Sequence, residues 1–301
     1  MENEQIMVSV RCPVYNQEKY IGACLDGFVK QITSFKYEVI VHDDASTDNT
    51  PSIIADYARK YPDIIKPIYE TENQRRKKNG SLRRIMNQAC TGKYIAMCDG
   101  DDYWTDPYKL QKQVVFLESH PDFTLCFHSA SVLIENNSPK FIDCEHIEER
   151  EYFTRDIFPH WIIPTASVVC RRGVFMAPIL HREMLLYGDI VTFLQAAKLG
   201  RLWGMNEQMS VYRINAGGVT QTGKKPDYRR WISHEKCLRM NFPDIDRSMI
   251  NRNIAGYYYS LAKNEGNPLK AFVLYFNSFF NSPAFLFAKM VDGIKRTVKH
   301  R

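Results

Sequence analysis

Short apolar runs alternate with amphipathic segments along the first hundred residues. Apolar runs of strand length lie at Met7–Cys12, Tyr37–Val41, Ile64–Tyr69 and Tyr94–Cys98. The segments between them have apolar residues at helical spacing, and they are Glu18–Gln31, Thr50–Tyr61 and Leu82–Cys90. Strands that are apolar nearly throughout and alternate with helices are typical of a parallel sheet covered by helices on both faces. The pattern therefore predicts an α/β fold with a mostly parallel sheet flanked by helices.

The pattern is less regular beyond the helix that we expect to begin near Tyr108, with Pro107 at its first position. It indicates strands at Ala166–Arg171 and Gln208–Ile214 and a helix at Ile190–Leu199. From Pro226 onward it is mostly helical. We therefore predict one domain over residues 1–225, with a first half of about 1–120 and a second half of about 121–225 that could hold a second substrate. A helical C-terminal extension is expected over residues 226–301.

Polar clusters follow three of the predicted strands. They are Pro13-Val14-Tyr15-Asn16, Asp43-Asp44-Ala45-Ser46-Thr47-Asp48 and Asp99-Gly100-Asp101-Asp102. In a parallel sheet flanked by helices, ligands bind outside the carboxyl ends of the strands. One crevice could therefore gather all three clusters.

The third cluster places three carboxylates in a single turn. Such anions repel one another unless a cation or hydrogen-bond donors compensate their charge. Mg²⁺ or Mn²⁺ that holds a diphosphate is the natural occupant of a site with these oxygen ligands. The alternative is a solvated acidic turn that caps the helix near Tyr108.

The second cluster contains an aspartate pair before a helix start. Ser46 or Asp48 can cap the helix that begins near Thr50, which leaves the pair itself unexplained. A carboxylate at this place can accept a hydrogen bond from a nucleobase N–H, and Tyr15 can supply a ring for stacking. Tyr15 could equally be a core residue.

Composition and charge exclude some classes of protein. The 301 residues suffice for one large α/β domain with an extension, and the net charge of +6 indicates an anionic ligand or surface. The basic residues are scattered and surrounded by no recognised module, so a nucleic-acid binder is not expected. The eight cysteines stand singly, as in reduced cytosolic proteins, and the polar N-terminus has no export signal. We therefore expect a cytoplasmic protein.

The three clusters and their flanking strands resemble family 2 glycosyltransferases of the GT-A fold, which has a Rossmann-like sheet. The similarity rests on Pro13 to Glu18, on Val41 to Thr50 and on Gly92 to Asp102. It is strong over residues 6–120 and traceable to about residue 220. Three motifs in the right order make the match specific. The sequences of these motifs resemble those of bacterial enzymes that build surface polysaccharides.

The resemblance implies a nucleotide-sugar donor in the first half of the domain, with UDP preferred. Asp44 would contact the base beside Tyr15, and Asp99 and Asp101 would hold the donor. The metal, Mn²⁺ or Mg²⁺, would be bound by Asp101 and Asp102. Further donor-binding residues would be Pro13, Glu18, Arg84 and Arg213. For Arg84, and for Arg83 beside it, a solvated basic helix face is the alternative.

The resemblance also implies a catalytic base in the acceptor half. Family members that invert the anomeric centre need a carboxylate that takes the proton from the acceptor hydroxyl. Asp189, in Tyr187-Gly188-Asp189-Ile190, matches the place of that aspartate. Read alone, Asp189 would be a helix N-cap.

Two features depart from relatives of the family. Asn215 stands where many relatives have a histidine that reaches the metal or the diphosphate. Either the metal is then held mainly by the aspartates and the donor phosphates, or Arg213 and the backbone near Gly217 and Gly218 take more of the phosphate contact. The chain also lacks the Q-x-x-R-W motif of processive relatives, because no glutamine lies three residues before Arg230. Addition of a single sugar is therefore favoured.

The C-terminal segment combines aromatic, aliphatic and basic residues. Leu269–Val298 is too interrupted by polar residues to span a bilayer, but it could hold the enzyme against an anionic membrane on its inner face. The basic residues beside it are Lys289, Lys295, Arg296, Lys299 and Arg301. The alternative is that its phenylalanines, Phe272, Phe279, Phe285 and Phe287, pack on the catalytic domain or on a partner subunit.

The first functional hypothesis is an inverting, metal-dependent glycosyltransferase. It would move one sugar, a hexosyl or N-acetylhexosaminyl group, to a glycan or polyprenyl-linked glycan at the cytoplasmic membrane face. The alternative is a catalytically silent donor-binding scaffold of a polysaccharide assembly complex, which has no chemical need for Asp189. A sugar nucleotidylyltransferase would require a glycine-rich loop with a basic residue after the first strand, and Pro13 to Gln17 offers none.

Overall fold

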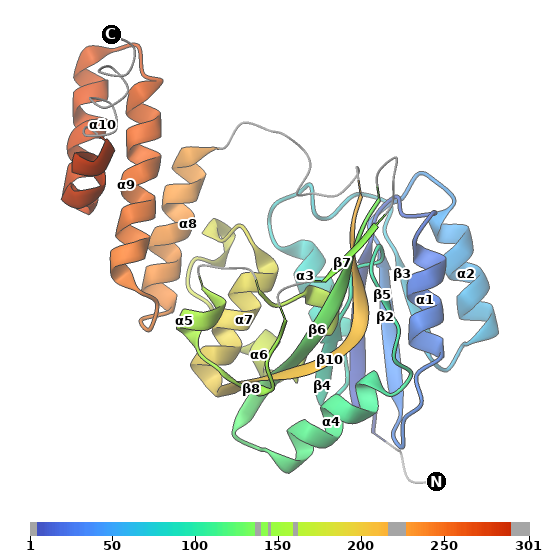
Figure 1. The fold of residues 1–301 in the computed structure, drawn as a ribbon. Coiled ribbons are helices and arrows are strands. Elements are labelled where there is room, and N and C mark those ends of the chain that lie inside the picture. Colours follow the sequence, from blue (N-terminus) through green and yellow to red (C-terminus); the bar gives the residue numbers. More distant parts are fainter. Residues whose placement is uncertain (1–4, 136–139, 144–145, 159–161, 216–226, 290–301) are drawn as a thin grey trace. The chain divides into compact units, whose positions relative to one another are not determined.

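The structure is a computed structural model that describes residues 5–135, 140–143, 146–158, 162–215 and 227–289 (Figure 1). The chain forms two compact units, Met1–Ala177 with Thr192–Thr222, and Pro178–Val191 with Gly223–Arg301. The larger part of the second unit begins at Gly223, close to the boundary that we predicted at residue 225, and residues 178–191 join it. Residues 178–191 group with the C-terminal helices because they bond to them: Leu180 N donates to Asn241 Oδ1 at 2.8 Å, and Leu186 N donates to His234 Nδ1 at 3.2 Å.

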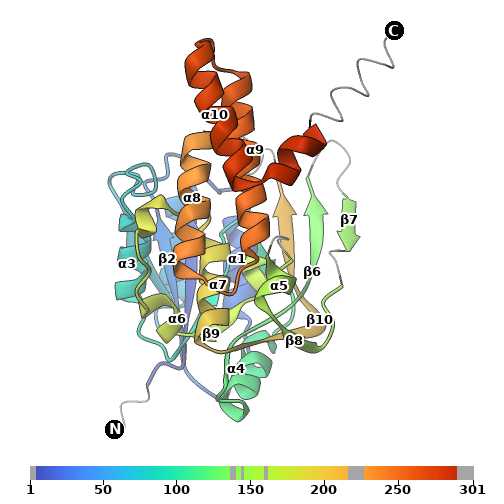
Figure 2. The same cartoon turned by 90° about the vertical axis from the view of Figure 1, so that its left-hand side faces the viewer.

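The first part of the sheet is parallel, as predicted. Its strands are β1 (Val8–Val14), β2 (Tyr37–Asp43), β3 (Ile65–Tyr69) and β4 (Tyr94–Met97), in the order β3-β2-β1-β4. Helices α1 (Ile21–Val29), α2 (Thr50–Lys60) and α4 (Lys109–Ser119) lie on one face, and α3 (Ser81–Ala89) lies on the other (Figures 1 and 2). Alternate residues of β1 are fully buried against the first face, namely Val8, Val10 and Cys12.

The sheet becomes mixed beyond β4. Its further strands are β5 (Tyr103–Trp104), β6 (Phe123–Ile134), β7 (Lys140–Asp143), β8 (Arg150–Tyr152), β9 (Val169–Arg171) and β10 (Arg201–Ile214). Strands β6 and β10 pair in parallel, whereas β5, β7, β8 and β9 pair antiparallel with their neighbours. Short helices complete the unit, namely α5 (Thr154–Ile157) and α6 (Gly173–Met176). The α/β class is confirmed, and the parallel arrangement holds chiefly for the part before residue 98.

Several boundaries differ from the sequence prediction. The strand expected from Ala166 begins at Val169, because Thr165–Ser167 forms a 3₁₀ turn. The strand expected at Gln208–Ile214 extends back to Arg201. Pro107 precedes α4 by two residues and is not its first residue. The ends of these strands and of α4 depend on packing against residues distant in the sequence, which the local pattern of apolar residues does not report.

Close packing at one glycine shows how the core is built. Phe28 of α1 meets Trp104 of β5 edge-to-face, with ring centroids 4.7 Å apart. A Cβ on Gly27 would lie 2.8 Å from the backbone oxygen of Trp104, so only glycine allows this approach. The seven described cysteines are buried and free, as predicted, and Cys144 lies outside the described residues.

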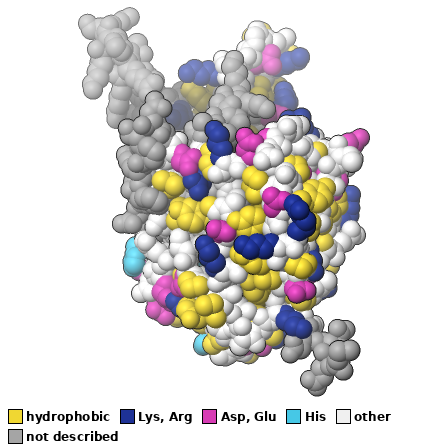
Figure 3. All heavy atoms as spheres, turned by 90° about the vertical axis from the view of Figure 1, so that its right-hand side faces the viewer, with side chains coloured by type: hydrophobic (Ala, Val, Ile, Leu, Met, Phe, Trp, Pro, Cys, Tyr) yellow, Lys and Arg dark blue, Asp and Glu magenta, His cyan; other side chains and the backbone are white. Residues whose placement is uncertain are grey.

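Charged side chains are mixed on the side where α1 and α2 lie in Figure 1. Among the described residues of this face, lysines and arginines lie interspersed with acidic and apolar side chains (Figure 3). A nucleic-acid surface instead gathers basic side chains in one patch or stripe. This face has no such patch among the residues that the structure describes.

The second unit contains the helices that were predicted from Pro226 onward. They are α8 (Tyr228–Asn241), α9 (Arg247–Lys263), α10 (Pro268–Asn281) and a further helix over Pro283–Lys289. Asp227, Asp246 and Asn267 cap the first three through side-chain oxygens. Helix α7 (Gly188–Leu199) begins in this unit and ends in the first.

No single helix among residues 5–289 that the structure describes is long and apolar enough to cross a bilayer. The last two helices reach that length and composition only together, and they are bent by 119° between residues 281 and 283. The basic residues Lys295, Arg296, Lys299 and Arg301 lie outside the described residues.

A buried acid makes the stability of the second unit depend on pH. Glu235 of α8 is 4% exposed and accepts a hydrogen bond from Asn253 Nδ2 at 2.9 Å, and burial raises its pKa from 4.5 to about 7. The folded state then holds a proton that the unfolded state has lost between these pH values. We predict that stability falls as the pH rises from 4.5 to about 7, and that Glu235→Gln removes this slope. Urea unfolding of both proteins across this range measures it, and parallel slopes would contradict the assignment.

Candidate donor site and catalytic aspartate

The polar clusters after β1, β2 and β4 meet at one edge of the sheet. Strand β1 lies between β2 and β4, with Val14 opposite Asp43 and Arg11 opposite Met97. The backbone ties continue beyond the strands, because Asp44 N donates to Val14 O at 2.9 Å and Gly100 N donates to Pro13 O at 3.3 Å. The structure therefore brings together the three clusters that the sequence placed in one crevice.

The loops after β1 and β2 are fastened to each other. Asn16 N donates to Ser46 Oγ at 2.8 Å, and Thr47 N donates to Asn16 Oδ1 at 2.8 Å. Asn16 and Ala45 have φ angles of 51° and 63°, a left-handed conformation that costs energy in residues other than glycine. This strained pair of turns is maintained by the reciprocal hydrogen bonds and presents Tyr15 at the edge.

Glu18 takes part in the same fastening. Its carboxylate accepts a hydrogen bond from Asn49 N at 2.9 Å, and its own N–H donates to Asp48 Oδ2 at 3.1 Å. The side chain thus caps the start of α2 from a neighbouring loop. A direct contact of Glu18 with the donor stays a prediction.

Asp44 anchors the loop that follows β3. Asp44 is only 3% exposed. Its two carboxylate oxygens accept hydrogen bonds from Gln74 N at 2.6 Å and from Arg75 N at 3.1 Å. Its carbonyl oxygen accepts a third from Asn73 Nδ2 at 2.9 Å. An ionised carboxylate has about four acceptor positions, so capacity remains for a ligand N–H. These partners lie some thirty residues away along the chain, so the local pattern of residues around Asp44 did not reveal them.

The basic loop after β3 reaches Tyr15. Arg76 Nη2 donates to Tyr15 Oη at 3.2 Å, and its guanidinium carbon lies 5.6 Å from the centroid of that ring. Tyr15 is half-buried, and Arg76 is exposed. A positive charge therefore lies beside the ring that we expect to stack on the base. The basic run at residues 75–78 is visible in the sequence, but none of its residues is among the site residues that we predicted.

Strand β10 holds the acidic turn. Asp102 is 2% exposed and accepts a hydrogen bond from Arg213 N at 2.8 Å. The carboxylate of Asp101 accepts one from Asn215 Nδ2 at 3.0 Å, and its carbonyl accepts one from Arg213 Nε at 2.8 Å. Asn215, the departure from the family pattern, therefore orients Asp101. Gly217 and Gly218 lie outside the described residues.

Arg213 is committed to partners within the protein. Its guanidinium also pairs with Glu135 and lies between the rings of Tyr20 and Tyr103, at 4.8 and 5.3 Å from their centroids. Its side chain is only 9% exposed. These contacts make Arg213 a positioning residue for the acidic turn, and its contact with a phosphate stays a prediction.

The acidic turn is short of positive charge. Burial, and then the neighbouring Asp101 and Asp99, raise the pKa of Asp102 well above its usual range. A hard divalent cation prefers carboxylate oxygens, and Mg²⁺ is commonly held by one or two carboxylates plus substrate phosphates. Within the described residues no three acidic, histidine or cysteine side chains form a closed metal site. The donor set therefore fits a cation that is shared with a diphosphate.

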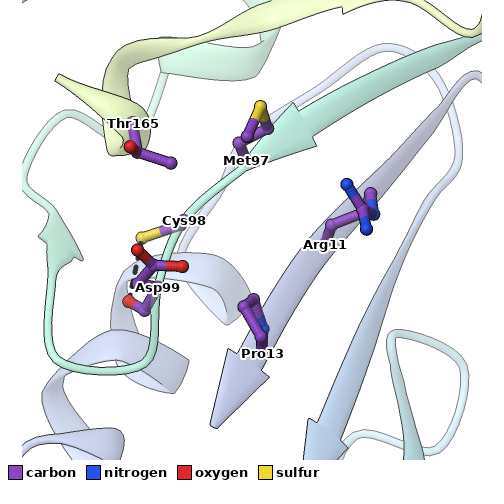
Figure 4. Close-up of a pocket in the computed structure, with 6 residues that line it drawn as sticks. All are labelled: Arg11, Pro13, Met97, Cys98, Asp99 and Thr165. Carbon is purple, nitrogen blue, oxygen red and sulfur yellow. Dashed lines mark hydrogen bonds between the residues drawn. The ribbon is translucent and has the colours of Figure 1, made fainter. Parts of the chain in front are cut away.

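A small cavity under this edge contains an unexpected arginine. The cavity has a volume of about 50 Å³ and is lined by Arg11, Pro13, Met97, Cys98, Asp99 and Thr165 (Figure 4). Arg11 Nε is buried without a hydrogen-bond partner, and the guanidinium carbon lies 4.5 Å from the centroid of the Phe175 ring. Arg11 is a charged residue inside a mostly apolar strand, and this feature of the sequence could have identified it as a candidate site residue.

The two arginines of α3 differ in their surroundings. Arg83 Nη2 donates to the carbonyl oxygen of Phe175 at 2.8 Å, which ties α3 to α6. Arg84 is exposed. The structure does not place Arg84 in contact with the other site residues, so its role in donor binding stays a prediction.

Asp189 belongs to the second unit, whereas the three polar clusters belong to the first. It lies in the first turn of α7 and is half-buried. Burial and then the charge of the Asp189 carboxylate raise the pKa of Tyr187. The ring of Tyr187 lies 5.4 Å from that of Trp231, which in turn lies 5.7 Å from that of Tyr257. The second unit therefore contains a cluster of aromatic rings that includes Tyr187, two residues before Asp189.

We predict that Asp44→Asn loosens the loop after β3 and weakens nucleotide binding. The amide can accept from only one of the two backbone N–H groups, and an unsatisfied buried group costs about 1–3 kcal/mol. Hydrogen exchange at Gln74 or Arg75 should accelerate, and UDP affinity measured by calorimetry should fall by about tenfold. Asp63→Asn, at an exposed position outside this edge, is the matched control. Unchanged exchange and affinity in Asp44→Asn would remove the anchoring role.

Comparison with known sequences reveals clear relatives. The family model described as glycosyl transferase family 2 matches residues 9–175. An uncharacterized protein of Mycobacterium tuberculosis is 38% identical over 218 residues, and the match covers 72% of this chain but only 61% of that relative. TuaG of Bacillus subtilis, whose name assigns it to teichuronic acid biosynthesis as a glycosyltransferase, is 28% identical over 250 residues, which are 80% of this chain and 92% of TuaG.

Solved structures with the same fold include two nucleotide-sugar complexes. S. aureus TarS in complex with UDP-GlcNAc has a TM-score of 0.62 at 18% identity, covering 91% of this chain and 80% of TarS. The mannosyltransferase PcManGT of Pyrobaculum calidifontis, in complex with GDP-Man and Mn²⁺, has a TM-score of 0.52 at 18% identity and covers 96% of this chain and 84% of its own. The likeness confirms the GT-A fold class.

Proposed function

The chain belongs to glycosyl transferase family 2, whose model matches more than half of its length, and we propose that it is an inverting, metal-dependent glycosyltransferase. It would move one sugar from a UDP-sugar to a hydroxyl of a glycan or lipid-linked glycan in surface polysaccharide synthesis. The observation that carries the proposal is the meeting of Tyr15, Asp44 and the acidic turn at one edge of the parallel strands.

The donor would lie across this edge. Tyr15 offers a ring for the base, and Asp44 offers a carboxylate whose position is fixed by two backbone N–H groups. Asp99 and Asp101 would hold the ribose and the diphosphate, with Pro13 and Gly100 keeping their turns together. TarS binds UDP-GlcNAc on the same fold, which supports a nucleotide sugar and a uridine base. A hexosyl or N-acetylhexosaminyl group is the proposed cargo.

Asp101 and Asp102 would hold Mn²⁺ or Mg²⁺ with the diphosphate. When bound, such a cation stabilises the charge that develops on the leaving nucleoside diphosphate. The residues of the chain keep the turn ready for this role. Asn215 orients the Asp101 carboxylate, and the N–H of Arg213 holds Asp102. The Mn²⁺ in the PcManGT complex supports a divalent ion.

Asp189 would act as the base on the acceptor hydroxyl. Its carboxylate would take the hydroxyl proton while the acceptor oxygen bonds to the anomeric carbon and the bond to the diphosphate breaks, so that the configuration inverts. The aromatic cluster of Tyr187, Trp231 and Tyr257 in the same unit supports a sugar acceptor, because a ring face can pack against the apolar face of a pyranose.

The acceptor and the place of action are part of the proposal. The name of TuaG refers to teichuronic acid biosynthesis, which supports a glycan acceptor. We propose that this glycan is free or polyprenyl-linked and that transfer takes place at the inner face of the membrane. The position three residues before Arg230 is Asp227, which caps α8, so addition of a single sugar remains our proposal.

The second candidate is a silent donor-binding scaffold, which would keep the sheet-edge site without using Asp189.

A panel of nucleotides tests the donor class. Thermal unfolding of the intact protein should shift upward with UDP in the presence of Mn²⁺, since a ligand that binds only the folded state stabilises it. CDP and GDP serve as comparisons, and UMP tests the need for the second phosphate. A larger shift with GDP than with UDP would overturn the proposed base, and no shift with any diphosphate would overturn the donor site.

A further inference from the structure

Helix α10 has one continuous face of large apolar side chains that are exposed. Phe272, Phe276 and Phe280 are 66%, 53% and 67% exposed, and Leu269 and Val273 are 75% and 51% exposed. Their spacing of three and four residues places them on a single stripe of the helix. We call these five residues the outer face of α10.

The opposite side of α10 already has its partner. Leu274 and Ser278 are buried, and Ser278 Oγ donates to the carbonyl oxygen of Ala255 in α9 at 2.8 Å. Tyr275 packs edge-to-face on Tyr259 of α9, with ring centroids 5.8 Å apart. The packing of the helices therefore does not use the outer face. Soluble monomers rarely expose a contiguous apolar stripe of this kind, which is typical of an interaction surface.

The segment that contains the outer face has basic side chains and no acidic ones. Between Pro268 and Lys289 the sequence has two lysines, Lys270 and Lys289, both exposed, and no acidic residue. An anionic surface complements this combination of apolar and basic side chains. Two copies of the chain that packed through this face would instead bring like charges together without an acidic group on either helix to compensate.

We propose that the outer face of α10 docks on an anionic lipid surface. The phenylalanines and Leu269 would enter the boundary between headgroups and acyl chains, while Lys270 and Lys289 contact the headgroups. Docking would keep a lipid-linked acceptor near the enzyme, and only this purpose rests on the proposed function. The docking itself is independent of the donor site.

Vesicle binding tests the proposal. The intact protein should sediment with phosphatidylcholine vesicles that contain phosphatidylglycerol, and much less with pure phosphatidylcholine or at high salt. The double substitution Phe276→Glu/Phe280→Glu should weaken the partitioning by at least about tenfold, because it removes two apolar contacts and adds like charge to the lipid surface. Met240→Glu, on α8 and 56% exposed, is the matched control and should bind as the original protein does.

A second variant separates charge from apolar contact. Lys270→Glu/Lys289→Glu should lose the preference for anionic vesicles, and circular dichroism checks that each variant is folded. Equal sedimentation of all variants, or binding that ignores lipid charge, would overturn the proposal. A dimer in light scattering that Phe276→Glu/Phe280→Glu dissociates, without vesicle binding by the original protein, would assign the face to a second copy. UDP binding should stay unchanged in every variant, so a failure of the donor site is recognised separately.

Discussion

Replacing Asp189 with asparagine is expected to reduce sugar transfer by about 10²–10⁴-fold, which is the usual effect of losing a general base. The amide keeps the shape of the side chain but cannot accept the proton of the acceptor hydroxyl. Donor affinity should stay within a few-fold, because the donor-binding residues that we predict belong to the first unit and Asp189 belongs to the second. Transfer rates and UDP calorimetry on the same preparations separate the two effects.

The control for this prediction is Asp244→Asn, which neutralises an exposed acid of the same unit. It should leave both transfer and binding unchanged. If Asp189 serves only as a helix cap, its asparagine variant will keep near-normal transfer, since asparagine caps helices as well as aspartate does. That result would remove the catalytic assignment.

The second large effect is expected at the metal. Asp101→Asn should lower UDP affinity in Mn²⁺ by about 10–100-fold, a range seen when metal sites lose supporting groups. The asparagine oxygen can still accept the hydrogen bond from Asn215, so the change removes charge and spares the turn. An excess of chelator should lower the affinity of the unmodified protein to a similar level.

Calorimetry with and without chelator measures this effect. Asp63→Asn, remote from the acidic turn along the chain and exposed, provides the control. Equal UDP affinity of the unmodified protein in Mn²⁺ and in chelator would contradict a metal shared with the diphosphate. Loss of affinity in chelator alone, with Asp101→Asn unaffected, would move the metal to other ligands.

The meeting of the three polar clusters at one edge of the sheet could be predicted because it depends on topology. Once the apolar runs indicate parallel strands, the residues after β1, β2 and β4 must meet at their carboxyl ends. Asp44 and the acidic turn were placed together in this way, and their roles in donor binding stay predictions. Their chemistry was then readable from residue type alone, since clustered carboxylates require compensation by donors or cations.

The support of these residues could not be predicted in the same way. The amides that hold Asp44 come from a loop some thirty residues away, and the residues that hold Asp101 come from β10, more than a hundred residues away. Such contacts arise from tertiary approach, which the local pattern of apolar residues does not encode. The grouping of residues 178–191 with α8 was missed for the same reason.

The stereochemistry of donor turnover tests the central claim most directly. The unmodified protein, Mn²⁺ and an α-linked UDP-sugar would be followed by proton NMR without an acceptor, so that water slowly takes the acceptor's place. We predict that UDP is released only with the metal and that the β-anomer of the free sugar accumulates first, before mutarotation mixes the α- and β-anomers. Initial accumulation of the α-anomer, or release of UDP at the same rate in excess chelator, would contradict an inverting, metal-dependent glycosyltransferase.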